Sequence, residues 1–221
     1  MFTILILCAT DELEKEARMN HKEFFERLPK EYTPAERNKI EQAYHVSKTE
    51  FMLEKRDGGE RYFNHCRRVA LLLMKYYRPP LILWSDNVII ALLHDVLEDC
   101  WPPENMLKDL FGKEVNRGVL VLSKLIPVYD KNSGYARTKT KLDVNRYLEA
   151  ISLENSVLGI TKMADRLDNI KTMNNVWPKK RQLKYVKETE LMLNIFHEKF
   201  QHSAAYYDLK RELDNIKARL T

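Results

Sequence analysis

The spacing of apolar side chains most constrains the fold of this chain, because through most of its length it follows the 3.6-residue period of an α-helix. This period predicts helices over residues 35–55, 64–77, 142–152, 156–174, 179–200 and 204–220. Shorter helices are expected from Ser85 to about Asp99, after Pro103 as far as Leu110, and over 113–125. With only 6 Gly and 8 Pro among 221 residues, the chain has too few turn-forming residues for a many-stranded barrel or sandwich. We therefore expect an all-α fold.

Capping and turn-forming residues interrupt the helical pattern. Thr33 is expected to cap the helix over 35–55, with Pro34 at its first position, and Ser85-Asp86 to cap a later helix. The two glycines of Arg56–Gly59 tolerate positive φ, so this segment is expected to be a turn. Pro127–Lys139 is polar and contains a glycine, and we expect it to be a loop. Loops of this kind in compact helical domains are often functional.

Charge and cysteine content limit the partners and the compartment. Lys and Arg exceed Asp and Glu by 37 − 32 = 5; this mild, interspersed excess suits an anionic small molecule better than specific nucleic-acid binding. Cys8, Cys66 and Cys100 form no CxxC pair or disulfide framework, which is typical of the reducing cytosol. The apolar stretch Met1–Ala9 is too short to span a bilayer and lacks a basic start. We expect it to be a buried strand or docked helix, and the protein to be cytoplasmic without membrane contact.

The segment Ala91–Asp99 carries the strongest chemical signal. Its apolar run ends in one histidine and three acids, namely His94, Asp95, Glu98 and Asp99. Burying these charges without a partner is costly, and a divalent metal ion would make the arrangement favourable. On one continuous helix His94 and Glu98 are four residues apart, as are Asp95 and Asp99, so both pairs share a side. One pair can then ligate an ion while the other reaches a water bound to it.

Two ligands are too few for a metal ion, so others are expected elsewhere in the chain. His65 lies in the first turn of a helix, and Asp165 interrupts an otherwise apolar helix face. Taken alone, His65 would be a surface or hydrogen-bonded core histidine, and Asp165 the partner of a nearby Arg or Lys. Joined with His94 and Asp95, they form a histidine–aspartate set that suits Mn²⁺, Fe²⁺ or Mg²⁺ better than a closed zinc site.

The order of these residues resembles the H…HD…D signature of the HD superfamily of phosphohydrolases. Arg56–His65 resembles the R-x-x-G-x-x-Y-x-x-H segment of the RelA/SpoT hydrolase domain, and Ala91–Asp99 is similar to its ALLHDVxED motif. Phe111–Val115 matches its FGxxV, and Lys162–Asn169 resembles its KLADRLxN. The resemblance is collinear over some two-thirds of the chain, from about residue 41 to residue 193.

The resemblance implies a metal-dependent guanosine 3′,5′-bis(diphosphate) 3′-pyrophosphohydrolase, which converts ppGpp or pppGpp to GDP or GTP plus pyrophosphate. One Mn²⁺ ion, with Mg²⁺ or Fe²⁺ as alternatives, would be held by His65, His94, Asp95 and Asp165. The acidic pair that orients and deprotonates the attacking water falls on Glu98 and Asp99. The nucleotide-binding positions fall on Arg56, which would stack on the guanine, and on Asn169 and Thr172, which would line the nucleoside pocket.

The resemblance also implies a domain organisation. Residues 34–200 would form a compact single HD hydrolase domain, with 1–33 as an N-terminal appendage and 201–221 as an extra C-terminal helix packed on it. Larger family members add synthetase and regulatory domains, for which 221 residues leave no room. We therefore expect a small alarmone hydrolase that acts alone on a small nucleotide, and the oligomeric state is left open.

Three departures from the family pattern keep the substrate open. Residues 51–54 read Phe-Met-Leu-Glu where His-x-Gly-Gln is usual, Cys66 replaces a proline, and Asp168 replaces a frequent histidine. Phe51 and Asp168 are near pocket positions in sequence, so ppApp-type nucleotides and NADPH are alternative substrates. A third alternative is a non-catalytic nucleotide-binding HD regulator, in which a ligand or the acidic pair would be lost. Basic residues are expected to hold phosphates, or to belong to a solvated loop: Arg61, Lys131, Arg137 and Lys139.

Overall fold

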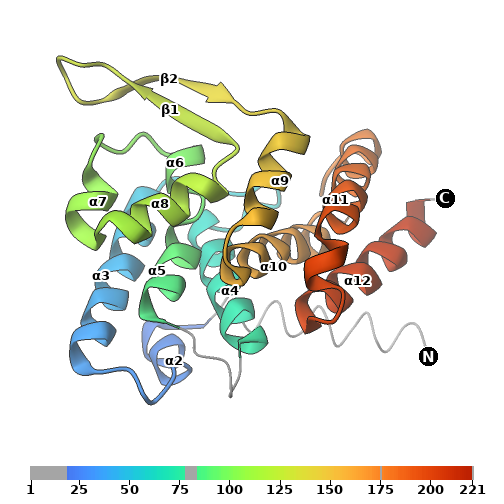
Figure 1. Ribbon diagram of the computed structural model, residues 1–221, viewed down its shortest axis with the longest axis horizontal. Helices are drawn as coiled ribbons and strands as arrows, with labels where there is room; N and C mark the ends of the chain where they lie inside the picture. The colour runs from blue at the N-terminus through green and yellow to red at the C-terminus, as the bar shows by residue number, and fades with distance from the viewer. Residues whose placement is uncertain (1–18, 78–83, 175, 221) are drawn as a thin grey trace.

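The computed structural model describes residues 19–77, 84–174 and 176–220 (Figure 1). It is a compact packing of helices with one small hairpin, which confirms the all-α prediction. The helices are α2 (His21–Glu26), α3 (Pro34–Glu50), α4 (Tyr62–Tyr76), α5 (Ser85–Leu93), α6 (Val96–Asp99), α7 (Met106–Phe111), α8 (Lys113–Leu122), α9 (Val144–Leu153), α10 (Ser156–Thr172), α11 (Lys179–Phe200) and α12 (Ala204–Leu220). The strands are β1 (Leu125–Tyr129) and β2 (Ala136–Lys141).

The predicted start of α3 is confirmed. Thr33 accepts a hydrogen bond from the backbone N–H of Glu36, whose carboxylate accepts one from the backbone N–H of Thr33, and Pro34 is the first helical residue. The helix ends at Glu50 rather than residue 55, because Phe51 turns into the core and stacks on Tyr62 with 4.6 Å between ring centroids. The expected turn over 56–59 forms, with Gly59 at φ 83°.

The cap predicted for the helix at Ser85 was wrong by one residue. Trp84 is the N-cap, and the side chain of Asn87 accepts a hydrogen bond from its backbone N–H at 3.2 Å. Ser85 is therefore the first helical residue, and it is buried. From Val88 to Leu93 the helix α5 is apolar and buried, which is typical of a central helix. The helices α4, α5 and α10 form the centre of the molecule, and α3, α8, α9 and α12 pack around them (Figure 1).

The single helix expected from Ser85 to Asp99 is two helices. The first, α5, ends at Leu93 and α6 begins at Val96, so His94 and Asp95 lie at the break. The backbone N–H groups of Glu98 and Asp99 donate to the Asp95 carbonyl at 3.0 and 2.8 Å, which starts the new turn. The side chains on either side of the break therefore do not follow the i, i+4 spacing of one straight helix.

The loop prediction for Pro127–Lys139 was wrong, because most of this segment forms an antiparallel hairpin. Leu125 pairs with Lys141 and Tyr129 with Ala136, so only residues 130–135 connect the strands. Gly134 adopts φ 69° in this connection, and Asp130 accepts hydrogen bonds from two backbone N–H groups that follow it. The helix expected over 113–125 accordingly stops at Leu122. In Figure 1 the hairpin crosses the top of the molecule beside α6.

Both ends of the described chain add to one core. Met19, Phe24, Leu28 and Tyr32 are buried in the same cluster as the central helices, although they precede residue 34. The helix α12 packs on α10 and α11 through a buried apolar stripe that includes Leu209, Leu213 and Ile216. The domain limits at 33/34 and 200/201 stay predictions. Met1–Ala9, with Cys8, lies outside the described residues.

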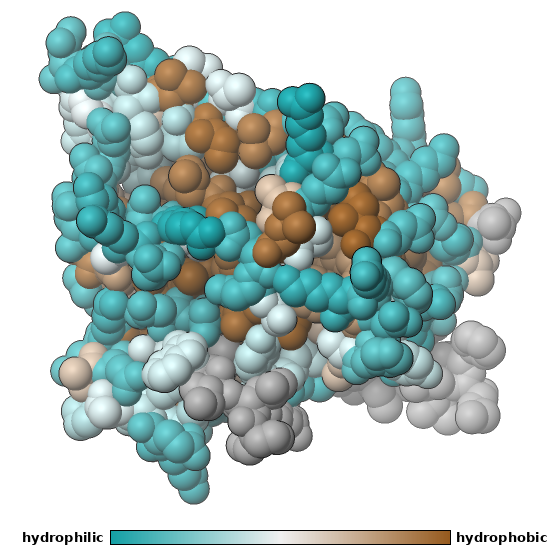
Figure 2. Space-filling view, viewed as in Figure 1, coloured by the Kyte–Doolittle hydropathy of each residue, from teal (hydrophilic) through white to brown (hydrophobic). Residues whose placement is uncertain are grey.

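The cysteines, the helix lengths and the surface bear on the predictions about disulfides and membrane contact. Cys66 and Cys100 are buried and free, so no disulfide forms between described residues. Within the described ranges, no helix is both long and apolar enough to cross a bilayer. The face in Figure 2 is mostly hydrophilic, with hydrophobic patches between the polar side chains.

Candidate active site

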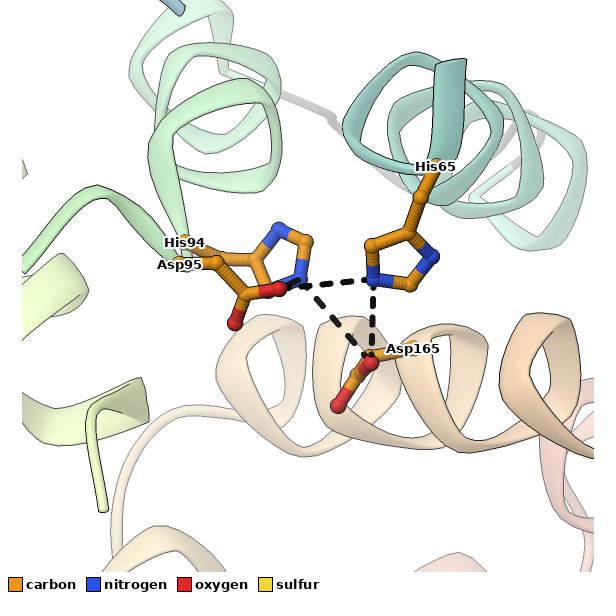
Figure 3. Close-up of side chains that lie close together, drawn as sticks. All are labelled: His65, His94, Asp95 and Asp165. Carbon is orange, nitrogen blue, oxygen red and sulfur yellow. Dashed lines mark ion pairs between the residues drawn. The ribbon is translucent and has the colours of Figure 1, made fainter. Parts of the chain in front are cut away.

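The four predicted metal ligands meet at one point. His65 comes from α4, His94 and Asp95 from the break between α5 and α6, and Asp165 from α10 (Figure 3). His65 Nε2 lies 3.4 Å from Asp95 Oδ2 and 3.3 Å from Asp165 Oδ1, and His94 Nε2 lies 3.0 and 3.9 Å from the same two oxygens. Each residue offers one atom within 4.8 Å of the other three. We call these four residues the floor of the site.

The orientation of the two histidines fits a divalent cation. His65 Nδ1 lies 2.6 Å from Asp168 Oδ2, and His94 Nδ1 lies 2.8 Å from the carbonyl oxygen of Ala91. A ring nitrogen that faces an acceptor carries the proton, so in each neutral ring Nε2 turns a lone pair toward the carboxylates. His94 Nε2 is buried and has no hydrogen-bond partner among the described residues. Two lone pairs and two carboxylates that converge in a buried space form a donor set that a divalent cation would stabilise.

Without a cation the floor retains extra protons. Burial lowers the pKa of His65, but its contacts with Asp165, Asp168 and Asp95 outweigh burial and raise the pKa to about 10. Burial likewise opposes protonation of His94, and Asp95 reverses this, so the pKa of His94 is also raised. Ligating imidazoles must be neutral, so loading of this site releases protons.

Asp165 is held by two neighbours on its own helix. Lys162 Nζ lies 2.7 Å from its Oδ2, and the Asn169 amide donates to its Oδ1 at 2.7 Å. Burial raises the pKa of Asp165, but the Lys162 ammonium and His65 more than offset this and hold the pKa well below its usual range. Lys162 is itself buried, with its ammonium 5.6 Å from the ring centre of Tyr147. The carboxylate therefore stays ionised and fixed in place.

Glu98 and Asp99 project from the short helix α6, and we call them the rim of the site. Glu98 Oε2 accepts a hydrogen bond from the Lys124 backbone N–H at 2.9 Å. The Tyr62 hydroxyl lies 2.5 Å from Asp99 Oδ2 and 2.9 Å from Asp95 Oδ2, which links the rim to the floor. Burial and the nearby Asp95 raise the pKa of Asp99 to about 6. Burial also raises the pKa of Glu98. These shifts suit a carboxylate that accepts a proton near neutral pH.

The hairpin fixes the backbone of the rim. Lys139 Nζ donates to the carbonyl oxygens of Glu98 and Cys100, both at 2.7 Å, and lies 4.3 Å from the ring centre of Trp101. Cations at the carboxyl end of a helix are favourable because the last carbonyl groups lack partners within the helix. Lys139 therefore has protein partners in place of the phosphate expected from the sequence. Arg137 in turn pairs with Asp130 at 2.9 Å.

Asp168 is a supporting residue whose role the sequence did not predict. It is fully buried, and besides His65 it accepts hydrogen bonds from Arg68 Nε at 2.5 Å and Arg56 Nη1 at 2.9 Å. Burial raises the pKa of Asp168, but Arg68 and His65 outweigh this and hold it well below its usual range. It lies behind the floor, where it orients His65, and is not among the described residues that line the cleft. The only signal in the sequence was its departure from the family's histidine.

A cleft of about 400 Å³ opens onto the floor and the rim. Its basic lining residues are Lys55, Arg56, Lys124, Lys162, Arg166 and Arg181, and its acidic ones are Asp57, Asp95, Glu98, Asp99, Asp165 and Glu188. The other lining residues are Tyr62, Tyr147, Asn169, Trp177 and Tyr185. The lining carries as many carboxylates as basic side chains, so a bound divalent cation would give the cleft a positive excess that suits a polyphosphate.

Two of the three predicted nucleotide-binding residues reach the cleft. Arg56 lines it and donates to Asn169 Oδ1, so these two residues form one unit with Asp168. Thr172 is not among the described residues that line it, and its hydroxyl donates to the Asp168 carbonyl at 2.7 Å. The far wall was not predicted: the Arg181 guanidinium lies 3.9 Å from the ring centre of Trp177. Arg181 lies in the basic run at the start of α11, and in the sequence only the nearby tryptophan distinguishes this run from a solvated helix face.

Comparison with known proteins places the chain in a family. The family model for the HD domain matches residues 43–197, which include every residue of the floor and the rim. The chain therefore belongs to the HD-domain family.

Several relatives of known name are similar to this chain over most of its length. The chain is 29% identical over 204 residues to a guanosine-3′,5′-bis(diphosphate) 3′-pyrophosphohydrolase of Aquifex aeolicus, covering 92% of this chain and 27% of the relative. It is 29% identical over 169 residues to a probable enzyme of the same name from Mycoplasma genitalium, and the match covers 76% of this chain and 23% of that relative. A GTP pyrophosphokinase rsh of Brucella melitensis is 31% identical over 173 residues, and the match covers 77% of this chain and 22% of that relative. The chain thus spans about a quarter of the length of these relatives.

A solved structure shares the fold. It is described as "A metazoan ortholog of SpoT hydrolyzes ppGpp and plays a role in starvation responses", and it superposes with a TM-score of 0.60 at 20% identity. The superposition covers 85% of this chain and 97% of the other.

Proposed function

We propose that this protein is a metal-dependent hydrolase that releases pyrophosphate from the 3′ position of guanosine 3′,5′-bis(diphosphate). The observation that carries the proposal is the joint placement of a buried His₂Asp₂ floor and an acidic rim at the base of a cleft whose walls include six Lys and Arg side chains. The names of the Aquifex and Mycoplasma relatives supply the substrate. The relatives are several times longer, so the activity is proposed for the HD-domain region that they share with this chain.

The floor would hold one Mn²⁺ ion, with Mg²⁺ or Fe²⁺ as alternatives, through His65, His94, Asp95 and Asp165. Two imidazoles and two carboxylates leave positions open in a six-coordinate ion, as hydrolysis requires. When bound, such an ion offsets phosphate charge and lowers the pKa of a coordinated water. The protein's part is to turn both imidazoles so that Nε2 faces the ion, and Asp168 and the Ala91 carbonyl do this by holding the Nδ1 side of each ring.

The rim residues would accept the proton that the attacking water loses. In the reaction, the water oxygen would bond to the phosphorus that carries the ribose 3′ oxygen, and the bond from this phosphorus to the 3′ oxygen would break. The 3′ oxygen would take up a proton from solvent and leave as the hydroxyl of GDP, and the other product would be pyrophosphate. Glu98 and Asp99 accept the proton that the water loses, and we treat them as a pair because the Glu98 charge contributes to the raised pKa of Asp99. Asp99, with its pKa raised to about 6, is ionised near neutral pH and basic enough for this step.

The cleft walls would bind the nucleotide. Arg56, fixed by Asp168 and Asn169, offers a planar guanidinium for stacking on the base. Lys124 and Arg166 both contact Glu188 at 3.3 Å and point into the cleft, where they can turn to phosphate oxygens. A role for Thr172 would be indirect, through the backbone of Asp168. The substrate is thus a small nucleotide, and we propose that the enzyme acts in the cytoplasm on free nucleotide rather than on nucleic acid or a membrane.

Product analysis tests the proposal. Purified protein loaded with Mn²⁺ is offered ppGpp, pppGpp, ppApp and NADPH separately, and products are resolved by anion-exchange chromatography. We expect GDP and pyrophosphate from ppGpp, and no turnover by Asp165→Asn. Asp214→Asn, an exposed aspartate on α12, is the matched control and should retain full activity.

Two results would overturn it. If only NADPH is hydrolysed, with release of orthophosphate, the proposed metal site would stand but the substrate would be NADPH rather than ppGpp. Turnover of none of the four nucleotides, by protein shown to hold metal, would favour a non-catalytic nucleotide-binding regulator.

A further inference from the structure

We propose a second metal site, outside the cleft, formed by His21, Glu41 and His45 and suited to Zn²⁺. His21 is the first residue of α2, and Glu41 and His45 lie on α3. The three side chains meet where these two helices lie against each other (Figure 1). Each of the three side chains offers one ligand atom within 4.8 Å of the other two. The site is independent of the proposed hydrolysis.

The spacing of this cluster matches that of the floor. His21 Nε2 lies 3.1 Å and His45 Nε2 4.0 Å from Glu41 Oε1. The four histidine–aspartate distances of the floor run from 3.0 to 3.9 Å. Ligand atoms about 2.0–2.2 Å from a tetrahedral Zn²⁺ lie roughly 3.3–3.6 Å apart. Small rotations of the more exposed Glu41 and His45 side chains therefore suffice to close the second cluster on an ion.

The local structure holds the donors in place. Glu41 and His45 are four residues apart on α3, so both project from one helix face. The ring of His21 stacks on Phe25 with 4.4 Å between centroids and meets the edge of Tyr44 at 5.2 Å. Its Nε2 atom is shielded from solvent and has no hydrogen-bond partner among the described residues. A fixed, shielded nitrogen that lacks a hydrogen bond is a donor ready for a metal.

The donor set selects the class of ion. Two imidazoles and one carboxylate are a common three-residue set for zinc, with the fourth position left to water. The three side chains are 41%, 44% and 58% exposed, so solvent reaches that fourth position. The floor, by contrast, is buried and has a second carboxylate, which suits harder six-coordinate ions. A bound ion would cross-link α2 to α3 and stabilise the N-terminal part of the described chain.

Zinc stoichiometry tests the site without relying on activity. The full chain, freed of metal and then dialysed against buffered Zn²⁺, is analysed by atomic emission for ions per chain. We expect the wild-type chain to hold one Zn²⁺ more than His45→Asn, whatever the occupancy of the floor, and His202→Asn to match the wild type. His202 is an exposed histidine outside both clusters, so it controls for the loss of an imidazole. Equal zinc content in wild type and His45→Asn would overturn the proposal.

Two further measurements address affinity and fold. In competition with a chromophoric chelator, His45→Asn and Glu41→Gln should each lower the Zn²⁺ affinity of this site by at least about 100-fold. Loss of a residue that only hydrogen-bonds to a ligand already lowers metal affinity by about 10–100-fold, and loss of the ligand itself should cost no less. Zn²⁺ should raise the midpoint of thermal unfolding of the wild type more than that of His45→Asn, with matching far-UV circular dichroism in both. An equal rise in both proteins would contradict the site.

Discussion

The floor and the rim of the site do adjacent parts of one task, yet they are built differently. The floor residues are buried, come from the central helices, and have their outer atoms held by neighbours such as Asp168 and Lys162. The rim stands on a helix of four residues, and Asp99 reaches solvent although protein surrounds most of its carboxylate. So short a helix is not stable alone and depends on tertiary contacts, here supplied by the hairpin through Lys139 and the Lys124 backbone.

This difference separates binding from chemistry. A rigid, buried floor can hold a cation in fixed geometry, because its ligands have few other conformations available. A rim that is partly open and held from outside can accept a proton and pass it to solvent. Substitutions in the floor should therefore abolish metal binding, and those in the rim should slow turnover without affecting the metal.

The largest effect is expected for Asp165→Asn. It removes a ligand and leaves the buried Lys162 without its carboxylate, so we expect a loss of activity of at least about 1000-fold and a loss of about 3 kcal/mol of folding stability. Hydrolysis assays and urea unfolding measure the two effects. Substantial activity at ordinary Mn²⁺ concentrations would show that the floor does not hold the ion.

The rim variants Glu98→Gln and Asp99→Asn should come next. Each removes a proton acceptor while keeping side-chain size, so we expect kcat to fall by about 10²–10⁴-fold with KM little changed. Steady-state kinetics at saturating Mn²⁺ test this. Wild-type kcat in both variants would remove the rim from the mechanism.

Asp168→Asn examines the support of the floor. The amide oxygen can still accept a hydrogen bond from His65 Nδ1, but the side chain lacks the charge that faces Arg68 and Arg56. We expect Mn²⁺ affinity to fall by about 10–100-fold, with kcat largely restored by excess Mn²⁺. Metal titrations at several Mn²⁺ concentrations measure this. A fall in kcat that excess metal does not restore would assign Asp168 to another role.

Lys139→Met examines the support of the rim. It removes the ammonium that holds the carbonyl groups of Glu98 and Cys100, while its stem can still cover Trp101. We expect kcat to fall by about tenfold with Mn²⁺ affinity unchanged. Lys131→Met, at the exposed end of the hairpin, is the matched control. If the two variants behave alike, the hairpin does not support the rim.

The smallest effect concerns stability and pH in the metal-free chain. The folded-state pKa of Asp99, about 6, lies above its unfolded value of about 3.9, so the folded chain binds this proton more tightly. The resulting stability is present below the unfolded pKa and is lost as pH rises through 6. Asp99→Asn should therefore be slightly more stable than wild type at pH 8, with solvent exposure limiting the gain. Thermal unfolding at pH 8 and pH 5 should show a smaller difference at the lower pH.

The floor was predictable from sequence and the support of the rim was not. Long amphipathic helices place their residues reliably, so His65 and Asp165 were found from their positions on α4 and α10. The break at His94–Asp95 depends on tertiary contacts, and an apolar run gives no sign of it. The hairpin was missed because both strands are short: β2 is polar, with Thr138 and Thr140 as its β-formers, and the apolar β1 follows directly on the helical pattern of α8 and contains a proline. Asp168 was seen as a departure, but its partners lie 100 or more residues away.

Manganese titration of three proteins tests the division between floor and rim most directly. Electron paramagnetic resonance of free Mn²⁺ gives the number of bound ions and their affinity for wild type, Asp99→Asn and Asp165→Asn. We predict one tightly bound ion in wild type and in Asp99→Asn with equal affinity, and no such ion in Asp165→Asn. Loss of the ion from Asp99→Asn, or its retention by Asp165→Asn, would contradict the account.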